Sequence, residues 1–352
     1  MTNWAESMQQ TFEYYTVDAG TWKNKDRLEV VKSSSLTIDS ESDTLGSATF
    51  DIVDILGEDY IRPYLVTVQN GITSKYPLGA YLIQTPSSNF DGKSRSTSAD
   101  AYTPLIELKE GYPDLGYTIY KGENIMDIAY RLTREHCRAP VIKPQCTDVL
   151  TSDFVSNTDD TWLTFISDLI SVANYQFGLD ELGRITYLPK QNSASLQPVY
   201  TYNDDNSSIL LPDVSMTHDL YGIPNAIEVV YSNDKNTYYA TAINKDPNSP
   251  TSTINRGRQI KTRITDPTFV GNVTQAQVQD YANRKLKEAS TIEYQVSYSH
   301  GYCPVRVGDG VLLNYTRADL RYVKAKVISQ TINCSTGCSV SETATFVKNL
   351  WG

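Results

Sequence analysis

The residues best suited to chemistry lie near the C-terminal end of the sequence. His300 and Cys303 are three positions apart, and Cys334 and Cys338 follow in the short stretch CSTGC. One imidazole and three thiolates are ligands that a tetrahedral zinc ion accepts. Zinc sites more often contain C-x-x-C pairs, and cysteine is also common as a small buried hydrophobic residue. A zinc site, a Cys334–Cys338 disulfide and simple burial stay open as alternatives, and our prediction assigns no metal ligand.

No local motif identifies a catalytic centre. None of the three histidines, His136, His218 and His300, has a nearby nucleophile with a recognisable signature, although members of a triad need not be adjacent in sequence. The sequence has no phosphate-binding glycine loop, no G-x-G-x-x-G and no H-E-x-x-H. The acidic pairs Asp159–Asp160 and Asp204–Asp205 lie in stretches rich in Asn, Ser and Thr, which are typical of turns and helix caps. We therefore predict no catalytic residue, no cofactor and no enzyme activity.

The stretch SHGYCPVRVGDGVLLNY, residues 299–315, also has an architectural interpretation. His300 ends an alternating strand, Pro304 interrupts it, and Gly308-Asp309-Gly310 turns the chain into the next strand. Each of these features has a backbone reason, so the sequence favours architecture over chemistry here.

Composition limits the classes of function. The 352 residues are enough for two or three domains, and 40% hydrophobic with 20% charged residues indicates a folded chain. The net charge of −10 argues against a nucleic-acid-binding surface, which needs clustered Lys and Arg. Five cysteines, an odd number, favour reduced thiols. No apolar run is long enough for a membrane helix, and the N-terminal segment does not resemble a signal peptide.

Tyrosine is unusually frequent, with 25 Tyr against 8 Phe. Its amphipathic ring suits strands with one wet face and is also favoured at protein interfaces. The sequence therefore indicates a mainly β protein, and an assembly surface is compatible with this composition.

Residues 1–105 are predicted to form a first antiparallel β-barrel domain. SATFDIVDI (47–55) alternates apolar and polar residues, and Asn70-Gly71 is a strong hairpin signal. In the first stretch, one face consists of Ala48, Phe50 and Ile52, and the other consists of Thr49, Asp51 and Val53.

Residues 106–195 are predicted to form a small α/β module. A strand and a Lys121-Gly122 turn precede a helix whose apolar stripe is Ile125, Ile128, Ala129 and Leu132. A second helix is expected at about 161–175, with N-cap candidates in NTDD before it. A hairpin through Asp180–Gly183 is expected to follow.

Residues 196–352 are predicted to form a second β-barrel domain that contains the helix 274–290. Thr274 and Gln277 have the spacing of a capping box, and the narrow apolar stripe suggests a helix that braces a barrel. The polar loop 243–259 is either a contact element or a mobile insertion.

This order of elements resembles the baseplate hub family of tailed bacteriophages, including the hub region of siphophage tail-associated proteins. The resemblance rests on phrases such as SATFDIVDI, YIRPYLVTVQNG, LGAYLIQTPSSNFDGKSRSTSADAYTPLIEL, DELGRITYLP and HGYCPVRVGDGVLLNY, in this order. It implies two antiparallel β-barrel-like domains joined by an α/β module.

The resemblance also implies a structural role in the tail of a virion assembled in the host cytoplasm. Members are homotrimers whose paired barrels form a pseudo-sixfold ring between the sixfold tail tube, or distal tail protein ring, and a threefold tip spike or fibre. The ring surrounds the channel for the tape measure protein and then for DNA, which passes without specific binding. Because the sequence ends at Trp351-Gly352, we expect the hub alone, with any hydrolase or spike supplied by another protein.

The phrase YTIYKGENIMDIAYRL resembles a LysM repeat as well, in which an aromatic strand precedes K-G-[DE] and an amphipathic helix. This resemblance implies peptidoglycan or glycan binding, which we retain as an alternative function. A cell-wall hydrolase using acidic residues is the second alternative.

Overall fold

The protein is mainly β in the computed structural model, as the sequence predicts, with 47% strand and 16% helix. The structure describes residues 2–28, 31–52, 57–90, 92–93, 95–191, 193, 195–206, 208–218, 220–232, 236–265, 267 and 273–349. The chain divides into two compact units: unit 1 is Met1–Val214 with Tyr298–Thr343, and unit 2 is Ser215–Ser297 with Ala344–Gly352. The predicted domain limits after residues 105 and 195 stay a prediction.

Fourteen strands of the described residues form one large sheet. These strands are β1 (Gln9–Val17), β2 (Asn24–Leu28), β3 (Val31–Asp39), β4 (Gly46–Ile52), β5 (Tyr60–Gln69), β6 (Ile72–Pro77), β7 (Tyr81–Phe90), β8 (Arg95–Tyr102), β13 (Pro198–Asn203), β14 (Leu210–His218), β18 (Thr291–Gly301), β19 (Gly310–Tyr315), β20 (Leu320–Asn333) and β21 (Ser339–Asn349). A short 3₁₀ turn, η1 (Thr316–Ala318), separates β19 from β20.

The sheet joins the N-terminal and C-terminal parts of the sequence. Its order is β14-β18-β21-β20-β3-β4-β8-β7-β5-β1-β2, with β6 beside β5, β19 beside β20 and β13 beside β19. The junction is the antiparallel pair β3–β20, in which Leu36 lies opposite Ile332. Leu36, Ile332 and Phe50 share one buried cluster, so the strands of both predicted β segments contribute to a common core.

The predicted alternation of β4 and the predicted hairpin are both confirmed. Ala48, Phe50 and Ile52 are buried on one face, whereas Val53 lies outside the described residues. The turn Asn70-Gly71 connects β5 to β6 with φ of 51° and 76°. Two consecutive positive φ values are what an Asn-Gly hairpin turn requires.

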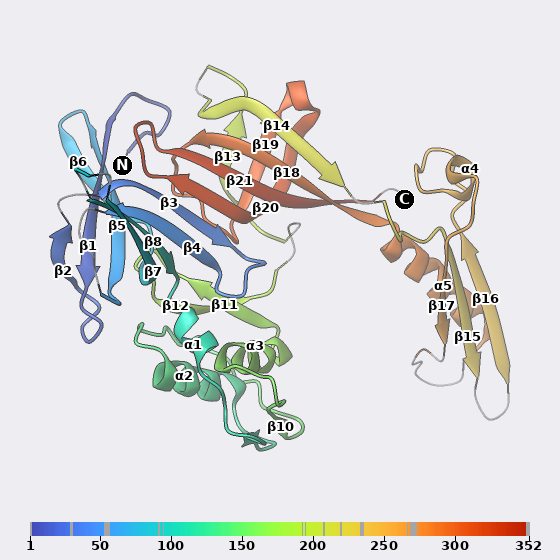
Figure 1. The fold of residues 1–352 in the computed structure, drawn as a ribbon. Helices are drawn as coiled ribbons and strands as arrows, with labels where there is room; N and C mark the ends of the chain where they lie inside the picture. Colours follow the sequence, from blue (N-terminus) through green and yellow to red (C-terminus); the bar gives the residue numbers. More distant parts are fainter. Residues whose placement is uncertain are drawn as a thin grey trace. The chain divides into compact units, whose positions relative to one another are not determined.

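Residues 105–190 lie within unit 1 and contain three helices and four short strands, and we call this segment the α/β module. Its elements are α1 (Ile106–Glu110), β9 (Thr118–Ile119), α2 (Ile125–His136), β10 (Phe154–Val155), α3 (Trp162–Val172), β11 (Tyr175–Leu179) and β12 (Ile185–Pro189). Figure 1 shows α1, α2 and α3 gathered beside the β11–β12 hairpin. The predicted stripe of α2 is buried, together with the apolar face of α3, in the core of the module.

The caps of these helices explain where they begin. The Asn124 side chain accepts a hydrogen bond from the Asp127 N–H at 2.9 Å and caps α2. Thr161 caps α3 through a capping box with Thr164. The prediction of a cap within NTDD was therefore wrong by one residue: the Asp160 carboxylate instead bonds back to the N–H of Asn157.

Unit 2 is a small α/β structure with its own core. It contains β15 (Ala226–Ser232), β16 (Thr237–Ile243), α4 (Thr253–Arg256), β17 (Lys261–Thr265) and α5 (Gln275–Ala289). The strand order is β16-β15-β17. The stripe of α5, with Val278, Ala282 and Leu286, packs on the apolar face of this sheet (Figure 1).

The predicted capping box of α5 is confirmed, because the Thr274 side chain and the Gln277 side chain each cap the other's backbone N–H. The helix belongs to the core of unit 2, so its interpretation as a brace for a barrel is corrected.

The polar segment 243–259 is a folded loop. The side chains of Asn244, Ser249, Thr251 and Ser252 are buried. The Asn244 amide donates to Ser249 Oγ at 2.9 Å, and Ser252 caps the short helix α4. Buried polar groups that bond to one another fix a loop in one conformation.

Among the described residues, no helix combines the length and apolar character that crossing a bilayer requires.

Candidate functional site

His300 and Cys303 lie in a buried polar network within unit 1. Both side chains are fully buried. The Tyr202 hydroxyl, from β13, is at the centre of the network: it lies 3.1 Å from His300 Nε2 and 3.3 Å from Cys303 Sγ. It also donates to Glu342 Oε2, from β21, at 3.2 Å. Residues from strands far apart in the sequence therefore meet at this point.

The carboxylate of Glu342 is the acceptor that holds the network together. Its oxygens accept hydrogen bonds from Tyr298 at 2.7 Å and from Gln330 at 2.6 Å. His300 Nε2 lies 3.3 Å from Glu342 Oε1, which makes a fully buried ion pair when the imidazole is protonated. A buried charge is tolerated only where an opposite charge and hydrogen bonds compensate its loss of hydration.

The ionisation of this pair follows from its partners. Burial alone would lower the pKa of His300, but the hydrogen bonds to Cys303 and Glu342 and the charge of Glu342 outweigh burial and raise the pKa to about 10. Burial would raise the pKa of Glu342, but the hydrogen bond and charge of His300 outweigh it and lower the pKa. Both groups are therefore charged near neutral pH.

The geometry of His300 differs from that of a catalytic relay. A relay uses one ring nitrogen for the nucleophile and the other for an orienting acid. Here Nε2 faces Tyr202 and Glu342 together, while Nδ1 lies 2.6 Å from the carbonyl oxygen of Gly301. The network joins β13, β18, β20 and β21, so its evident effect is to fix these strands to one another.

Cys334 and Cys338 lie elsewhere in unit 1. They belong to the apolar cluster that includes Tyr14 and Tyr302, and all five cysteines are free thiols. Burial raises the pKa of Cys334 to about 11. Within the described part of the chain, no three His, Cys, Asp or Glu residues are arranged to hold a metal ion. The structure thus brings His300 and Cys303 together but does not add Cys334 and Cys338 as further ligands.

The other predicted candidates contact residues that are distant in the sequence. His136 stacks on Trp162 with ring centroids 4.1 Å apart, and His218 stacks on Tyr294 at 4.7 Å. Asp204 Oδ2 accepts hydrogen bonds from the N–H and hydroxyl of Thr316. Asp204 thus bonds to the first residue of η1, and Asp160 bonds within its own turn to Asn157.

A cavity of about 530 Å³ lies inside unit 1, between the α/β module and the large sheet. Its volume is within the range of ligand pockets, which is about 300–1,000 Å³. The lining comes from several separate stretches of sequence, and this explains why no local motif indicates it. The stretches are 38–45, 77–81, 176–191, 302–309 and 326–332, and the single residues Thr103 and Leu196 complete the lining.

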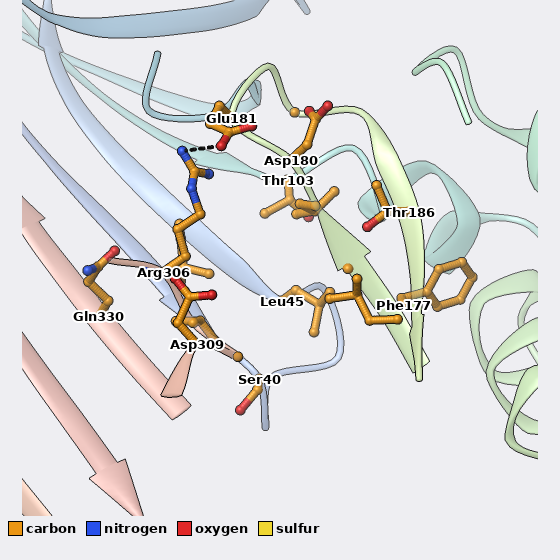
Figure 2. A pocket seen from close by; sticks show the side chains of 18 of the residues that line it. Ser40, Leu45, Thr103, Phe177, Asp180, Glu181, Thr186, Arg306, Asp309 and Gln330 are labelled. Carbon is orange, nitrogen blue, oxygen red and sulfur yellow. Dashed lines mark hydrogen bonds and ion pairs between the residues drawn. The ribbon is translucent and has the colours of Figure 1, made fainter. Parts of the chain in front are cut away.

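One ion pair joins two residues of the cavity lining. Arg306 Nη2 lies 3.0 Å from Glu181 Oε1, on the β11–β12 turn, and Figure 2 shows Arg306 and Asp309 on the opposite side from Asp180 and Thr186. Asp309 accepts a hydrogen bond from the Arg306 N–H at 2.9 Å, and burial raises the pKa of Asp309. Arg306, Glu181 and Asp309 in the lining are thus engaged by neighbouring parts of the fold.

Beside the cavity, the β11–β12 turn is fastened to the large sheet through backbone atoms. The carbonyl of Leu182 accepts hydrogen bonds from Trp22 Nε1 at 2.9 Å and from Arg62 Nη2 at 3.0 Å. The Gly79 N–H donates to the carbonyl of Glu181 at 2.9 Å. Gly183 has φ of +72°, and a Cβ there would lie 2.7 Å from the backbone nitrogen of Ala80. This docking contact fixes the turn against β5 and β7.

The fold of the whole chain is similar to the folds of known tail proteins. A tail protein from Neisseria meningitidis MC58 matches with a TM-score of 0.61 and 14% identity over 97% of this chain and 98% of that chain. The 43 kDa tail protein of prophage MuSo2 from Shewanella oneidensis matches with a TM-score of 0.60 and 9% identity over 96% and 98%.

A third similar structure is the Francisella PdpA–VgrG complex in its lidded form. It matches with a TM-score of 0.56 and 8% identity over 98% of this chain and 53% of that chain. No family profile matches the sequence, and no curated protein matches it. At these identities the likeness concerns the fold, and the chain has the β-rich fold of phage tail proteins.

Proposed function

We propose that this protein is a structural component of a phage tail or of a phage-derived injection device, and that it forms the hub at the tail tip. The observation that carries the proposal is the end-to-end likeness to two tail proteins, which extends over nearly the full length of both chains in each comparison. A partial likeness would concern only one part of the chain, whereas the likeness to these tail proteins extends over both unit 1, with its α/β module, and unit 2.

In this proposal the chain acts by assembly. Three copies form a ring that adapts the sixfold tail tube to the threefold tip and surrounds the channel for the tape measure protein and DNA. Its neighbours are the tail tube or distal tail protein ring and a spike or fibre, and its location is the virion tail. The acidic balance of the chain, with a net charge of −10, is compatible with a channel to which DNA does not adhere.

The structure offers features that suit a scaffold. One continuous sheet of fourteen strands contains strands from both ends of the sequence. The polar network around His300 and Glu342 is buried in unit 1 and includes an ion pair, so it is not accessible to solvent. Two carboxylates of the cavity lining are engaged as well: Glu181 pairs with the Arg306 guanidinium, and Asp309 accepts from the Arg306 N–H. We accordingly propose that the protein has no enzymatic activity of its own.

Light scattering of the purified full-length chain tests this proposal. The expected result is a mass three times that of the 39.4 kDa chain. This mass should not change with protein concentration once the concentration is well above the dissociation constant of the trimer. A single species with the mass of one chain at high concentration would contradict the ring.

Two inexpensive assays separate the alternatives. Retention of the protein on purified peptidoglycan or host polysaccharide would favour the glycan-binding alternative, in which the LysM-like segment at β9 and α2 makes the contact. Clearing of host cell walls in a zymogram would favour the hydrolase alternative. The proposal predicts neither retention nor clearing.

A further inference from the structure

The turn between β20 and β21 has the sequence CSTGC, residues 334–338, and the proposed function does not use its two thiols. β20 and β21 are neighbours in the large sheet, and two side-chain hydrogen bonds show which of their residues face each other. Gln330 Nε2 donates to Glu342 Oε1 at 2.6 Å. Asn333 Nδ2 donates to Ser339 Oγ at 3.2 Å. Both bonds fit one register, in which each step forward along β20 is one step backward along β21.

In this register, Cys334 lies opposite Cys338. Cys334 follows Asn333, and Cys338 precedes Ser339. Gly337 and Cys338, with φ of 88° and 37°, turn the chain back. Opposite residues of an antiparallel pair have Cα atoms about 4.5–5.5 Å apart, and a disulfide spans Cα separations of about 4.4–6.8 Å. The register therefore places the two cysteines at a spacing that a disulfide can bridge.

The two thiols also share one environment. Cys334 and Cys338 are 4% and 0% exposed, and both lie in the hydrophobic cluster that contains Ile332 and Val340. Burial raises the pKa of the Cys338 thiol, and the negative charge of a Cys334 thiolate raises it further. The two side chains thus lie on the same buried side of the hairpin.

Backbone hydrogen bonds anchor the turn at each cysteine. The Cys334 N–H donates to the carbonyl of Ser34, on β3, at 2.9 Å. The Cys338 carbonyl accepts from the Tyr302 N–H at 3.1 Å. Residues 335–337, between the two cysteines, are exposed, so a small reagent gains access to the thiols when these residues move aside.

We infer that Cys334 and Cys338 are a disulfide site, at which oxidised glutathione cross-links the β20–β21 turn. This inference goes beyond the proposed function and does not depend on the ring. The bond closes the turn while its hydrogen bonds to Ser34 and Tyr302 stay in place. Glutathione keeps thiols reduced in a cytoplasm, and the bond forms in an oxidising environment.

The cross-link forms by two successive exchanges. The Cys334 thiolate attacks one sulfur of oxidised glutathione and releases the first glutathione, because its pKa of about 11 is lower than that of Cys338. The Cys338 thiolate then attacks the Cys334 sulfur of this mixed disulfide and releases the second glutathione. The two cysteines lose two protons and two electrons, and one oxidised glutathione becomes two reduced molecules.

Oxidation of the folded full-length chain tests the inference. The purified protein is incubated with reduced or oxidised glutathione until the product ratio is constant, and free thiols are then alkylated in denaturant. Trypsin releases the peptide 327–348, which contains both cysteines, for mass spectrometry. Oxidised glutathione is expected to give the peptide with an internal disulfide. In urea, which removes the register, the ratio of cross-linked to reduced peptide is expected to be about tenfold lower or less.

Cys146→Ser is the matched control, because it removes a partly exposed thiol outside the turn and is expected to leave the cross-link unchanged. Cys338→Ser is expected to stop the reaction at a mixed disulfide on Cys334. A wild-type peptide that stays reduced, a cross-link to another cysteine, or an equal ratio in buffer and in urea would refute the inference. None of these results bears on the proposed ring.

Discussion

At the scale of single residues, His300 and Glu342 form a fully buried ion pair within unit 1. Four side chains from β13, β18 and β20 converge on the Glu342 carboxylate: Tyr202, Tyr298, His300 and Gln330. The sequence indicated His300 and Cys303 as candidates, and the preference for an architectural interpretation rested on backbone signals alone. Glu342 was not anticipated, because only the pairing order of β18, β21 and β20 brings it to His300.

Removing the charge of Glu342 is predicted to destabilise the protein. Glu342→Gln leaves His300 buried without its counter-charge, and breaking a buried pair in this way costs roughly 3 kcal/mol or more. Chemical denaturation followed by tyrosine fluorescence measures the free energy of unfolding. Glu41→Gln, on an exposed side chain, is the control and is expected to change it by less than about 0.5 kcal/mol.

The same pair predicts how stability depends on pH. The pKa of His300 is raised from 6.5 to about 10 in the folded protein, so its stabilisation is complete below about pH 6.5 and is lost as the pH rises towards 10. The pKa of Glu342 is lowered from 4.5, so its stabilisation is complete above about pH 4.5 and is lost on acidification. The contribution is therefore largest between about pH 4.5 and 6.5. In Glu342→Gln the decline above pH 6.5 should be smaller than in the wild type, and an unchanged decline would contradict the assignment.

At the scale of elements, hydrophobic periodicity and helix-cap residues predict most of the helices and turns that the structure contains. Three features can be predicted from the sequence because each depends on residues within a few positions of one another: the stripe of α2, the capping box of α5 and the Asn70-Gly71 turn. The short helices α1 and α4 were missed because five and four residues give too little periodicity. The cavity was missed for a different reason: its walls come from several stretches that are far apart in the sequence.

The contact between Gly183 and Ala80 predicts an unusually costly glycine. Gly183→Ala places a methyl group 2.7 Å from the Ala80 nitrogen at a φ of +72°, which forces the β11–β12 turn away from the sheet. We expect a loss of about 2–3 kcal/mol in the free energy of unfolding. Gly116→Ala is the control, because Gly116 has a φ of +73° and open space around the new methyl group; its expected cost is about 1 kcal/mol. Equal costs would show that the docking contact does not constrain the turn.

The capping box of α5 predicts a local effect in unit 2. Thr274→Ala removes the hydroxyl that accepts from the Gln277 N–H, and loss of such a cap costs about 1 kcal/mol. Hydrogen exchange should become faster for the first turns of α5 and stay unchanged for α3. The matched variant Thr161→Ala, at the cap of α3, should do the reverse. Faster exchange in both helices with either variant would contradict independent cores.

At the scale of the whole molecule, the end-to-end likeness to tail proteins agrees with the order of elements in the sequence. Element order survives where identity is only 9–14%, because alternation, turns and helical stripes can be kept while individual residues change. The surfaces that would join copies have no such periodic signal. They depend on which side chains the fold leaves exposed, and sequence periodicity does not report this.

The central claim is that this protein works as a threefold ring around a channel. Electron microscopy of the purified full-length chain tests it most directly, through class averages viewed along the symmetry axis. The account predicts rings with three equivalent copies and a central opening. Averages that show single chains, or closed particles with another symmetry and no opening, would contradict it.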